Sequence, residues 1–352
     1  PNSFLSVPMH SGFHLAIRKQ MKAPNHPITF LAALVTFLLG GCESTPKVQV
    51  STTAAIFPVR VSANGRHFED ASGKPFLLQG DTAWSLMVQL SREETEAYLE
   101  NRRRKGFNAI LVNLIEQFYA DDPPKNKQGD APFLTAGDFS TPNDAYFAHA
   151  DWVIRKTGEK GMLVVLNPCY TGNGPPGSSK LDGWANAIVA NEPAICRNYG
   201  RFLGRRYHGF SNLIWQAGGD QMPKPGSALE RNWLEILQGI KEHAPAHLWT
   251  AHWDRATTAR DQTAFAPHMT IDNIYTGGRT YIQALRAYNR PNPAPIFLNE
   301  AHYEGYGVTA YSRPADESPQ MMRAQAYWTL LSGASGHHFG SHHVWHFNWT
   351  GI

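Results

Sequence analysis

Cysteine is scarce in this chain of 352 residues, which holds only Cys42, Cys169 and Cys196. No two of them form a CxxC pair, and none stands with histidines at the spacing of a zinc site. The sequence therefore gives no sign of a redox dithiol or a structural zinc cluster. We expect Cys169 and Cys196 to be buried free thiols, with a disulfide between them as the alternative.

Charge is also low, since charged residues make up 17% of the chain and hydrophobic residues 42%. The formal net charge of +3 comes from Arg18, Lys19 and Lys22, because residues 1–41 hold no acid and the remainder is balanced. A nucleic-acid-binding domain would carry a basic surplus, so we exclude that class. The hydrophobic share is enough for one large α/β core.

No apolar run near the N-terminus is long enough for a transmembrane helix, but the run from Ile28 to Leu39 fits the core of a signal peptide. Residues 39–42, LGGC, resemble a bacterial lipobox, in which the cysteine is lipidated and becomes the mature N-terminus. We expect export to the bacterial periplasm or outer surface, with a membrane anchor on Cys42. A plain secretory signal with a chance cysteine is the alternative.

Domain boundaries follow from the same composition. We expect residues 1–20 to be an upstream extension, 21–42 a lipoprotein signal peptide, 43–57 a polar tether and 58–352 one folded unit. The chain stops at Ile352, just past the last expected strand, with no room for a helix to cover it. We therefore expect the sequence to be a piece of a longer protein, truncated after strand eight.

The GxGxxG turn of dinucleotide-binding folds is missing, because GDTAW, residues 80–84, follows the first buried strand. Strand-like and helix-like segments alternate instead, which predicts a parallel sheet, and eight strands favour a closed (β/α)8 TIM barrel of the α/β class. Asn64-Gly65 and Ser72-Gly73 predict a short N-terminal hairpin before it. We expect strands at 76–80, 109–115, 162–166, 213–216, 248–251, 270–274, 296–298 and 337–339, and helices at 92–105, 143–160, 192–207, 229–243, 281–288 and 320–331.

Two acids stand where expected strands end: Asp220 after NLIWQAGG and Glu300 after PIFLN. A barrel places its catalytic residues at the C-terminal ends of its strands, among the loops that follow, and long loops are expected at 117–141 and 169–190. Two carboxylates facing one pocket are what glycoside hydrolysis needs. The alternatives are a helix-capping role for Asp220 and an ion-pair role for Glu300, with Glu304 as the rival acid.

Five segments, taken in order, resemble the apiosidase-like (β/α)8 glycoside hydrolases, family 140 and its uncharacterised relatives. The resemblance implies a barrel, a retaining mechanism with two carboxylates, and apiose-containing pectin as one target among others. Family proteins also tend to continue into a C-terminal β-rich domain. The chain departs from the common family pattern at Asn299, Ala301 and His302 around Glu300, and at Gln221. The matching segments are NGRHFEDASGKPFLLQGDTAW, LSREETEAYLENRRRKGFNAILVNL, NLIWQAGGD, PIFLNEAHYEG and AYWTLLSGASGHHFGSHHVW.

A retaining enzyme needs one carboxyl group to protonate the leaving oxygen and another to attack the anomeric carbon. We assign these roles to Asp220 as general acid/base and Glu300 as nucleophile. Aromatic rings are candidate platforms for sugar faces, and polar residues at strand ends are candidate ligands of sugar hydroxyls, although Asp81 would also make sense as a structural cap. The candidate substrate-binding residues are Asp81, Trp84, Asn113, Asn167, His252, Trp253, Tyr275, Tyr303, Glu304 and His338.

Histidines gather in HHFGSHH, residues 337–343, and His252 follows the fifth strand. A metal-dependent barrel usually carries HxH on its first strand, which this chain lacks, so we expect these histidines to line the cleft and we expect no metal and no cofactor. The rival interpretations are a surface glycan-binding lipoprotein without turnover and a metal-dependent hydrolase. The oligomeric state, the sugar and its linkage are left open.

The lipobox interpretation predicts that the mature protein begins at a lipidated Cys42. Mass spectrometry of the protein made in a bacterial host should find no residue before Cys42 and the added mass of a lipid on it. Finding Cys42 unmodified, or removed with the signal peptide, would contradict the prediction.

Overall fold

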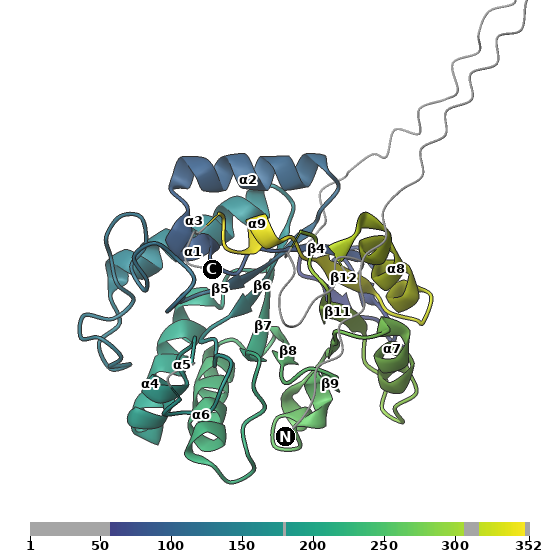
Figure 1. Ribbon diagram of the computed structural model, residues 1–352. Coiled ribbons are helices and arrows are strands. Elements are labelled where there is room, and N and C mark those ends of the chain that lie inside the picture. Colours follow the sequence, from purple (N-terminus) through teal and green to yellow (C-terminus); the bar gives the residue numbers. More distant parts are fainter. Residues whose placement is uncertain (1–56, 179–180, 306–316, 349–352) are drawn as a thin grey trace, which may run out of the picture. The chain divides into compact units, whose positions relative to one another are not determined.

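The computed structural model describes residues 57–178, 181–305 and 317–348, all of which belong to the unit Ser51–Ile352 (Figure 1). The expected signal peptide, Cys42 and all of the tether except Phe57 lie outside the described residues. No helix in the described part is long and apolar enough to cross a membrane.

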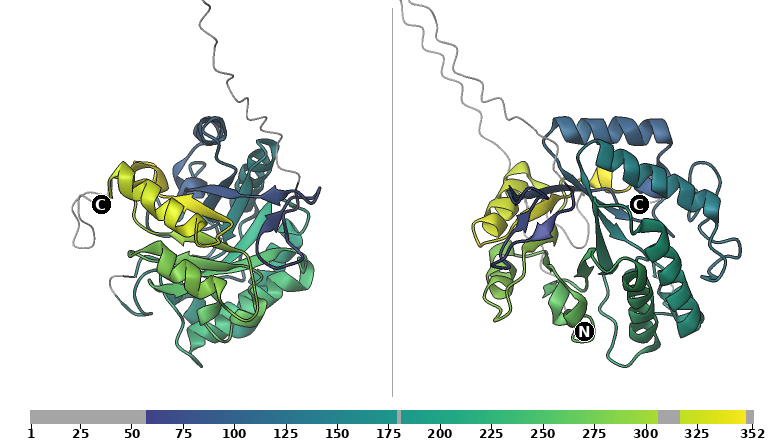
Figure 2. Two further views of the ribbon diagram at one scale, coloured as in Figure 1. Left: turned by 90° about the vertical axis from the view of Figure 1, so that its right-hand side faces the viewer. Right: turned by 180° about the vertical axis from the view of Figure 1, so that it is seen from behind.

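Nine strands form one sheet in the order β8-β7-β6-β5-β4-β12-β11-β10-β9. Every neighbouring pair is parallel except β9 and β10. The backbone N–H groups of Thr270 and Ile271 donate to the carbonyl of Trp249, which brings the two ends of the sheet together. The predicted (β/α)8 TIM barrel is therefore confirmed (Figure 2). The strands are β4 (Leu78–Thr82), β5 (Ala109–Asn113), β6 (Leu163–Asn167), β7 (Leu213–Gly218), β8 (Leu248–His252), β9 (Thr257–Thr258), β10 (Asp272–Tyr275), β11 (Ile296–Glu300) and β12 (Gly336–Phe339).

The longer helices follow the predicted ranges closely, and the capping box of Ser91 and Glu94 is present at the start of α2. Three short helices, α1, α4 and α9, were not predicted, because four to six residues are too few to show a helical period. The helices are α1 (Leu86–Gln89), α2 (Arg92–Arg104), α3 (Asp144–Glu159), α4 (Ala185–Ala190), α5 (Pro193–Tyr207), α6 (Ala228–His243), α7 (Thr280–Tyr288), α8 (Pro319–Leu330) and α9 (His342–Trp345).

Two details of the N-terminal prediction need correction. The hairpin is a three-stranded antiparallel sheet of β1 (Arg60–Val61), β2 (Phe68–Glu69) and β3 (Pro75–Phe76), because both predicted turns are used. The first barrel strand also begins later than expected, since β3 takes Phe76 and β4 runs from Leu78 to Thr82. Asp81 therefore lies within the strand and not at its tip.

Alternate residues of the barrel strands point to two different cores. In β5, Ile110 and Val112 pack against the surrounding helices, whereas Ala109 and Leu111 face the barrel interior with Phe297. All five residues of this strand are buried, which explains why the sequence shows a continuous apolar run without alternation. Cys169 and Cys196 are also buried as free thiols, as expected.

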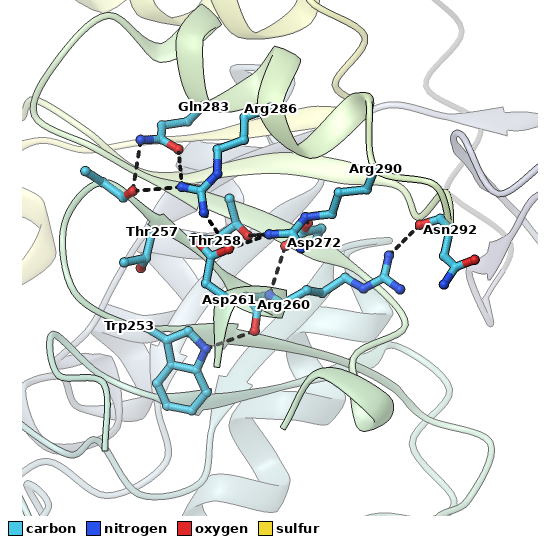
Figure 3. Close-up of polar contacts among 12 residues, drawn as sticks. Trp253, Thr257, Thr258, Arg260, Asp261, Asp272, Gln283, Arg286, Arg290 and Asn292 are labelled. Carbon is cyan, nitrogen blue, oxygen red and sulfur yellow. Dashed lines mark hydrogen bonds and ion pairs between the residues drawn. The ribbon is translucent and has the colours of Figure 1, made fainter. Parts of the chain in front are cut away.

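A network of charges holds the segment between β8 and β10 (Figure 3). Asp261 accepts from the guanidinium groups of Arg286 and Arg290, and Arg290 also pairs with the buried Asp272 at 3.1 Å. Trp253 donates its indole N–H to the carbonyl of Ala259 at 2.9 Å. These bonds anchor β9 and the turn after it, where the barrel has few ladder bonds of its own.

Helices α5 and α6 pack with their backbones in contact. A methyl group on Gly200 would lie 2.2 Å from the carbonyl oxygen of Ile236, and one on Gly239 would lie 2.2 Å from that of Arg197. Because the obstructing atoms are backbone, the helices would have to move apart to make room.

Gly200→Ala should therefore lower the free energy of unfolding by about 2 kcal/mol, despite the better helix propensity of alanine. Urea denaturation measures this value. Gly209→Ala is the matched control, since no atom lies within 4 Å of its added methyl group. Equal stability of the two variants would contradict the close packing of α5 and α6.

Candidate active site

A cavity of about 510 Å³ opens at the C-terminal ends of the barrel strands. Its walls come from the loops after β4, β5, β6, β7, β8, β10 and β11, together with the short helix α9. The lining residues are Trp84, Asn113, Tyr119, Tyr170, Asn173, Asp182, Asp220, Asp254, Arg255, Tyr275, Gly277, Glu300, Ala301, His302, Tyr303, Glu317 and Trp345.

Both predicted carboxylates face this cavity. Asp220 follows β7 and Glu300 is the last residue of β11. One oxygen of each carboxylate and one ring nitrogen of His252 lie within 4.8 Å of one another. The side chain of Asp220 is 24% exposed and that of Glu300 is 12% exposed, so Glu300 lies deeper.

The turn before Asp220 requires glycine at positions 218 and 219. Gly218 and Gly219 have φ values of 80° and 139°, and Asp220 itself has a φ of 48°. A methyl group on Gly219 would lie 2.2 Å from the ring of Tyr170, and one on Gly218 would lie 2.4 Å from the carbonyl oxygen of His252. The hydroxyl of Tyr170 donates to Asp220 Oδ2 at 2.6 Å, so the residue that fills the space beside Gly219 also orients the acid.

His252 lies between the two carboxylates. Its Nε2 is 3.5 Å from Asp220 Oδ1 and 3.3 Å from Glu300 Oε2, and the side chain is fully buried. The ring stacks on Trp84 at 5.6 Å and meets the ring of Tyr275 edge-on at 4.5 Å. Burial lowers the pKa of His252, which favours the neutral imidazole near pH 7.

Glu300 and Asp220 form an electrostatically coupled pair. Burial raises the pKa of Glu300 well above its usual range, the negative charge of Asp220 raises it further, and the Arg255 guanidinium opposes both. Arg255 Nε also donates to the hydroxyl of Tyr275 at 2.9 Å, and Tyr275 lies opposite Glu300 in the sheet. Two close carboxyl groups with one cation nearby tend to hold one proton between them.

Aromatic side chains form one wall of the cavity. Trp84 donates its indole N–H to the hydroxyl of Tyr303 at 3.0 Å, which fixes both rings. Trp345 of α9 meets Tyr119 edge-on at 4.8 Å and Tyr303 at 6.5 Å. Such rings present apolar faces on which the C–H face of a sugar can lie.

A third carboxylate, that of Asp182, lies in the cavity wall. It accepts from the hydroxyl of Tyr119 and from the backbone N–H of Asn173, and burial raises its pKa. Sequence reasoning missed Asp182, Tyr119, Tyr170 and Arg255. The only signal for the first three was their place in the long loops after β5 and β6, and no periodicity distinguishes single residues there.

Six predicted substrate-binding residues do not line this cavity, although one of them, His252, lies between its two carboxylates. Asp81 is buried within β4, where it pairs with Arg102 at 2.7 Å and accepts from the hydroxyl of Tyr98. Asn167 donates to the carbonyl of Gly218 at 2.8 Å and so supports the turn before Asp220. Both residues serve the scaffold, because Asp81 Oδ2 and the side-chain amide of Asn167 bind groups of neighbouring elements.

The other three are Trp253, Glu304 and His338. Trp253 is buried and donates a hydrogen bond to the carbonyl of Ala259, just after β9. His338 packs edge-on against Phe297 inside the barrel, with 5.2 Å between the ring centroids. Glu304 opens to a separate pocket that Arg102 and Lys105 also line. Four predicted residues do line the cavity: Trp84, Asn113, Tyr275 and Tyr303.

The histidines of residues 337–343 do not line the cavity either, so the sequence-based interpretation of HHFGSHH as a cleft wall needs correction. His337 and His338 are buried in β12, where burial lowers their pKa values to about 4 and about 3. Within the described residues, Asp220, His252 and Glu300 are the one group of three whose ligand atoms lie close enough to hold a metal ion.

Comparisons with known proteins agree with this architecture. The family described as "Apiosidase-like, catalytic domain" matches residues 62–351. No protein with a curated description matches the chain.

Several solved structures share the fold. A structure named "Glycoside hydrolase" is 24% identical, with a TM-score of 0.69 over 84% of this chain and 68% of the other. A glycoside hydrolase family 5 protein from Bacteroides vulgatus is 20% identical, with a TM-score of 0.70 over 85% of this chain and 66% of the other. A family 5 mannosidase from Rhizomucor miehei is 15% identical, with a TM-score of 0.53 over 81% and 85%.

These likenesses establish the barrel fold, and the chain spans only about two thirds of the first two structures. The family match covers the described unit almost from end to end, including both strand-end carboxylates. The chain therefore belongs to the family of apiosidase-like catalytic domains, and it is a glycosidase.

Proposed function

We propose that the chain hydrolyses plant-type glycans, apiose-containing pectic oligosaccharides among them, by double displacement with retention. The observation that carries this proposal is the close approach of Asp220 and Glu300 at the floor of the cavity. Retaining enzymes hold their carboxyl groups about 5 to 5.5 Å apart, whereas inverting enzymes leave about 6.5 to 9.5 Å for a water molecule. Oxygen atoms within 4.8 Å favour retention.

The exposure of the two acids supports Asp220 as general acid/base and Glu300 as nucleophile. The acid/base must exchange its proton with the leaving group and then with water, which suits the more exposed Asp220. The deeper Glu300 would attack the anomeric carbon from below. Burial favours the protonated form of Glu300 in the free protein, and the positive charge of Arg255 and of an oxocarbenium-like transition state would favour its anion.

In the first step Asp220 would protonate the glycosidic oxygen while Glu300 forms a bond to the anomeric carbon and the leaving group departs. In the second step Asp220 would take a proton from water, which displaces Glu300 from the sugar. Tyr170 would keep the Asp220 carboxyl oriented through both steps. The indole and phenol rings of the aromatic wall would support the sugar face.

We also propose that the protein is exported and anchored by a lipid on Cys42, as the lipobox-like sequence indicates. An exported glycosidase would meet oligosaccharides outside the cytoplasm, which suits a substrate of plant origin.

Glu300→Gln should reduce release of sugar by at least about a thousandfold, because the amide cannot act as nucleophile. The measurement is sugar release from apiose-bearing pectic oligosaccharides and from a panel of aryl glycosides. Glu304→Gln is the matched control, since Glu304 lies outside the cavity, and it should keep the parental rate. An unchanged rate in Glu300→Gln would remove Glu300 as nucleophile, and retained binding without any turnover would favour a glycan-binding protein.

Asp220→Asn should shift the acidic limb of the pH profile to lower pH. Glu300 must be ionised to attack, and its pKa is raised by burial and by the charge of Asp220, with Arg255 opposing. Removing that charge lowers the pKa of Glu300, so the variant stays active at lower pH than the parent. The test measures kcat/KM against pH with a dinitrophenyl glycoside, which needs no proton donor, alongside Glu304→Gln as the charge control. An unchanged acidic limb would contradict the effect of the Asp220 charge on the pKa of Glu300.

A further inference from the structure

His252 has surroundings that a purely structural role beside the two acids does not explain. It is fully buried, and neither ring nitrogen has a hydrogen-bond partner within the described residues. Asp220 Oδ1, the oxygen nearest to its Nε2, also lacks such a partner there. A buried polar group without a partner is costly, so a cluster of them suggests an absent ligand.

The distances within the cluster match those of a coordination sphere. Ligand atoms bonded at about 2.0 to 2.2 Å to a tetrahedral zinc ion lie about 3.3 to 3.6 Å from one another. Nε2 of His252 lies 3.5 Å from Asp220 Oδ1 and 3.3 Å from Glu300 Oε2. The two carboxylate oxygens are within 4.8 Å of each other.

We propose that Asp220, His252 and Glu300 form a binding site for a divalent cation of the zinc class, which inhibits the enzyme reversibly. One imidazole and two carboxylates leave one position of a tetrahedral sphere open, and both carboxylates line the cavity. An imidazole ligand suits zinc, nickel or cobalt, whereas magnesium and calcium prefer an all-oxygen set.

Inhibition rests on the proposed function. A bound cation would occupy the oxygen of Glu300 that attacks the sugar and an oxygen of Asp220 that carries the proton. The cation and the sugar would therefore exclude each other, which gives inhibition that is competitive with substrate and is reversed by a chelator.

The experiment uses the purified full chain and two probes, Zn²⁺ by calorimetry and Co²⁺ by visible absorption. Binding of Co²⁺ should give the intense visible bands of a tetrahedral site. Glu300→Gln and His252→Asn should each weaken the binding by at least about tenfold, because each removes one of three protein ligands. His343→Asn is the matched control, since His343 is exposed on α9 and should leave the binding at this site unchanged.

Glu300→Gln keeps the shape of its side chain, so the test stands even if His252→Asn fails to fold. Absence of the tetrahedral bands, or equal binding by the parent and Glu300→Gln, would overturn the proposal. So would activation by Zn²⁺, or loss of activity in chelator, with any substrate that the parent cleaves. If the parent cleaves no substrate, the proposed function fails while the binding measurements still decide on the metal site.

Discussion

The register of the parallel strands sets the position of every reacting group. Gly218 lies opposite His252 across β7 and β8, and Tyr275 lies opposite Glu300 across β10 and β11. Asp220 comes two residues after Gly218, so the turn through Gly219 returns it toward the ring of His252. A slip of one residue in either pair would turn the side chains to the other face of the sheet and separate the two acids.

The strands must also stay in register where β8 and β10 meet to close the barrel, because few backbone hydrogen bonds join them there. The segment between these strands carries Arg255, whose positive charge faces Glu300. The backbone of this segment is tied to β10 through the bond from Ala256 N–H to the carbonyl of Tyr275 at 2.8 Å. The network of Asp261, Arg286 and Arg290 does not line the cavity, yet it fixes the segment that brings this cation to the catalytic pair.

The strands, the longer helices and the two strand-end acids were predictable, because periodicity and apolar runs report directly on burial. Asp81 was misplaced by a boundary error of two residues, since β4 continues to Thr82 and encloses the carboxylate. Tyr170 and Asp182 were beyond reach for a different reason. Their roles depend on how loops after different strands meet, and single residues in loops leave no pattern in the sequence.

The electrostatics of the two acids explain why Tyr170, Arg255 and His252 surround them. Two carboxylates so close together cannot both be ionised at low cost, and burial increases that cost for Glu300. Tyr170 donates to Asp220 Oδ2, and Arg255 offsets part of the charge on Glu300. Burial lowers the pKa of His252, which favours an uncharged ring between the two acids. The two carboxylates and the ring between them therefore form one small site, which both the proposed catalysis and competition by a cation would use.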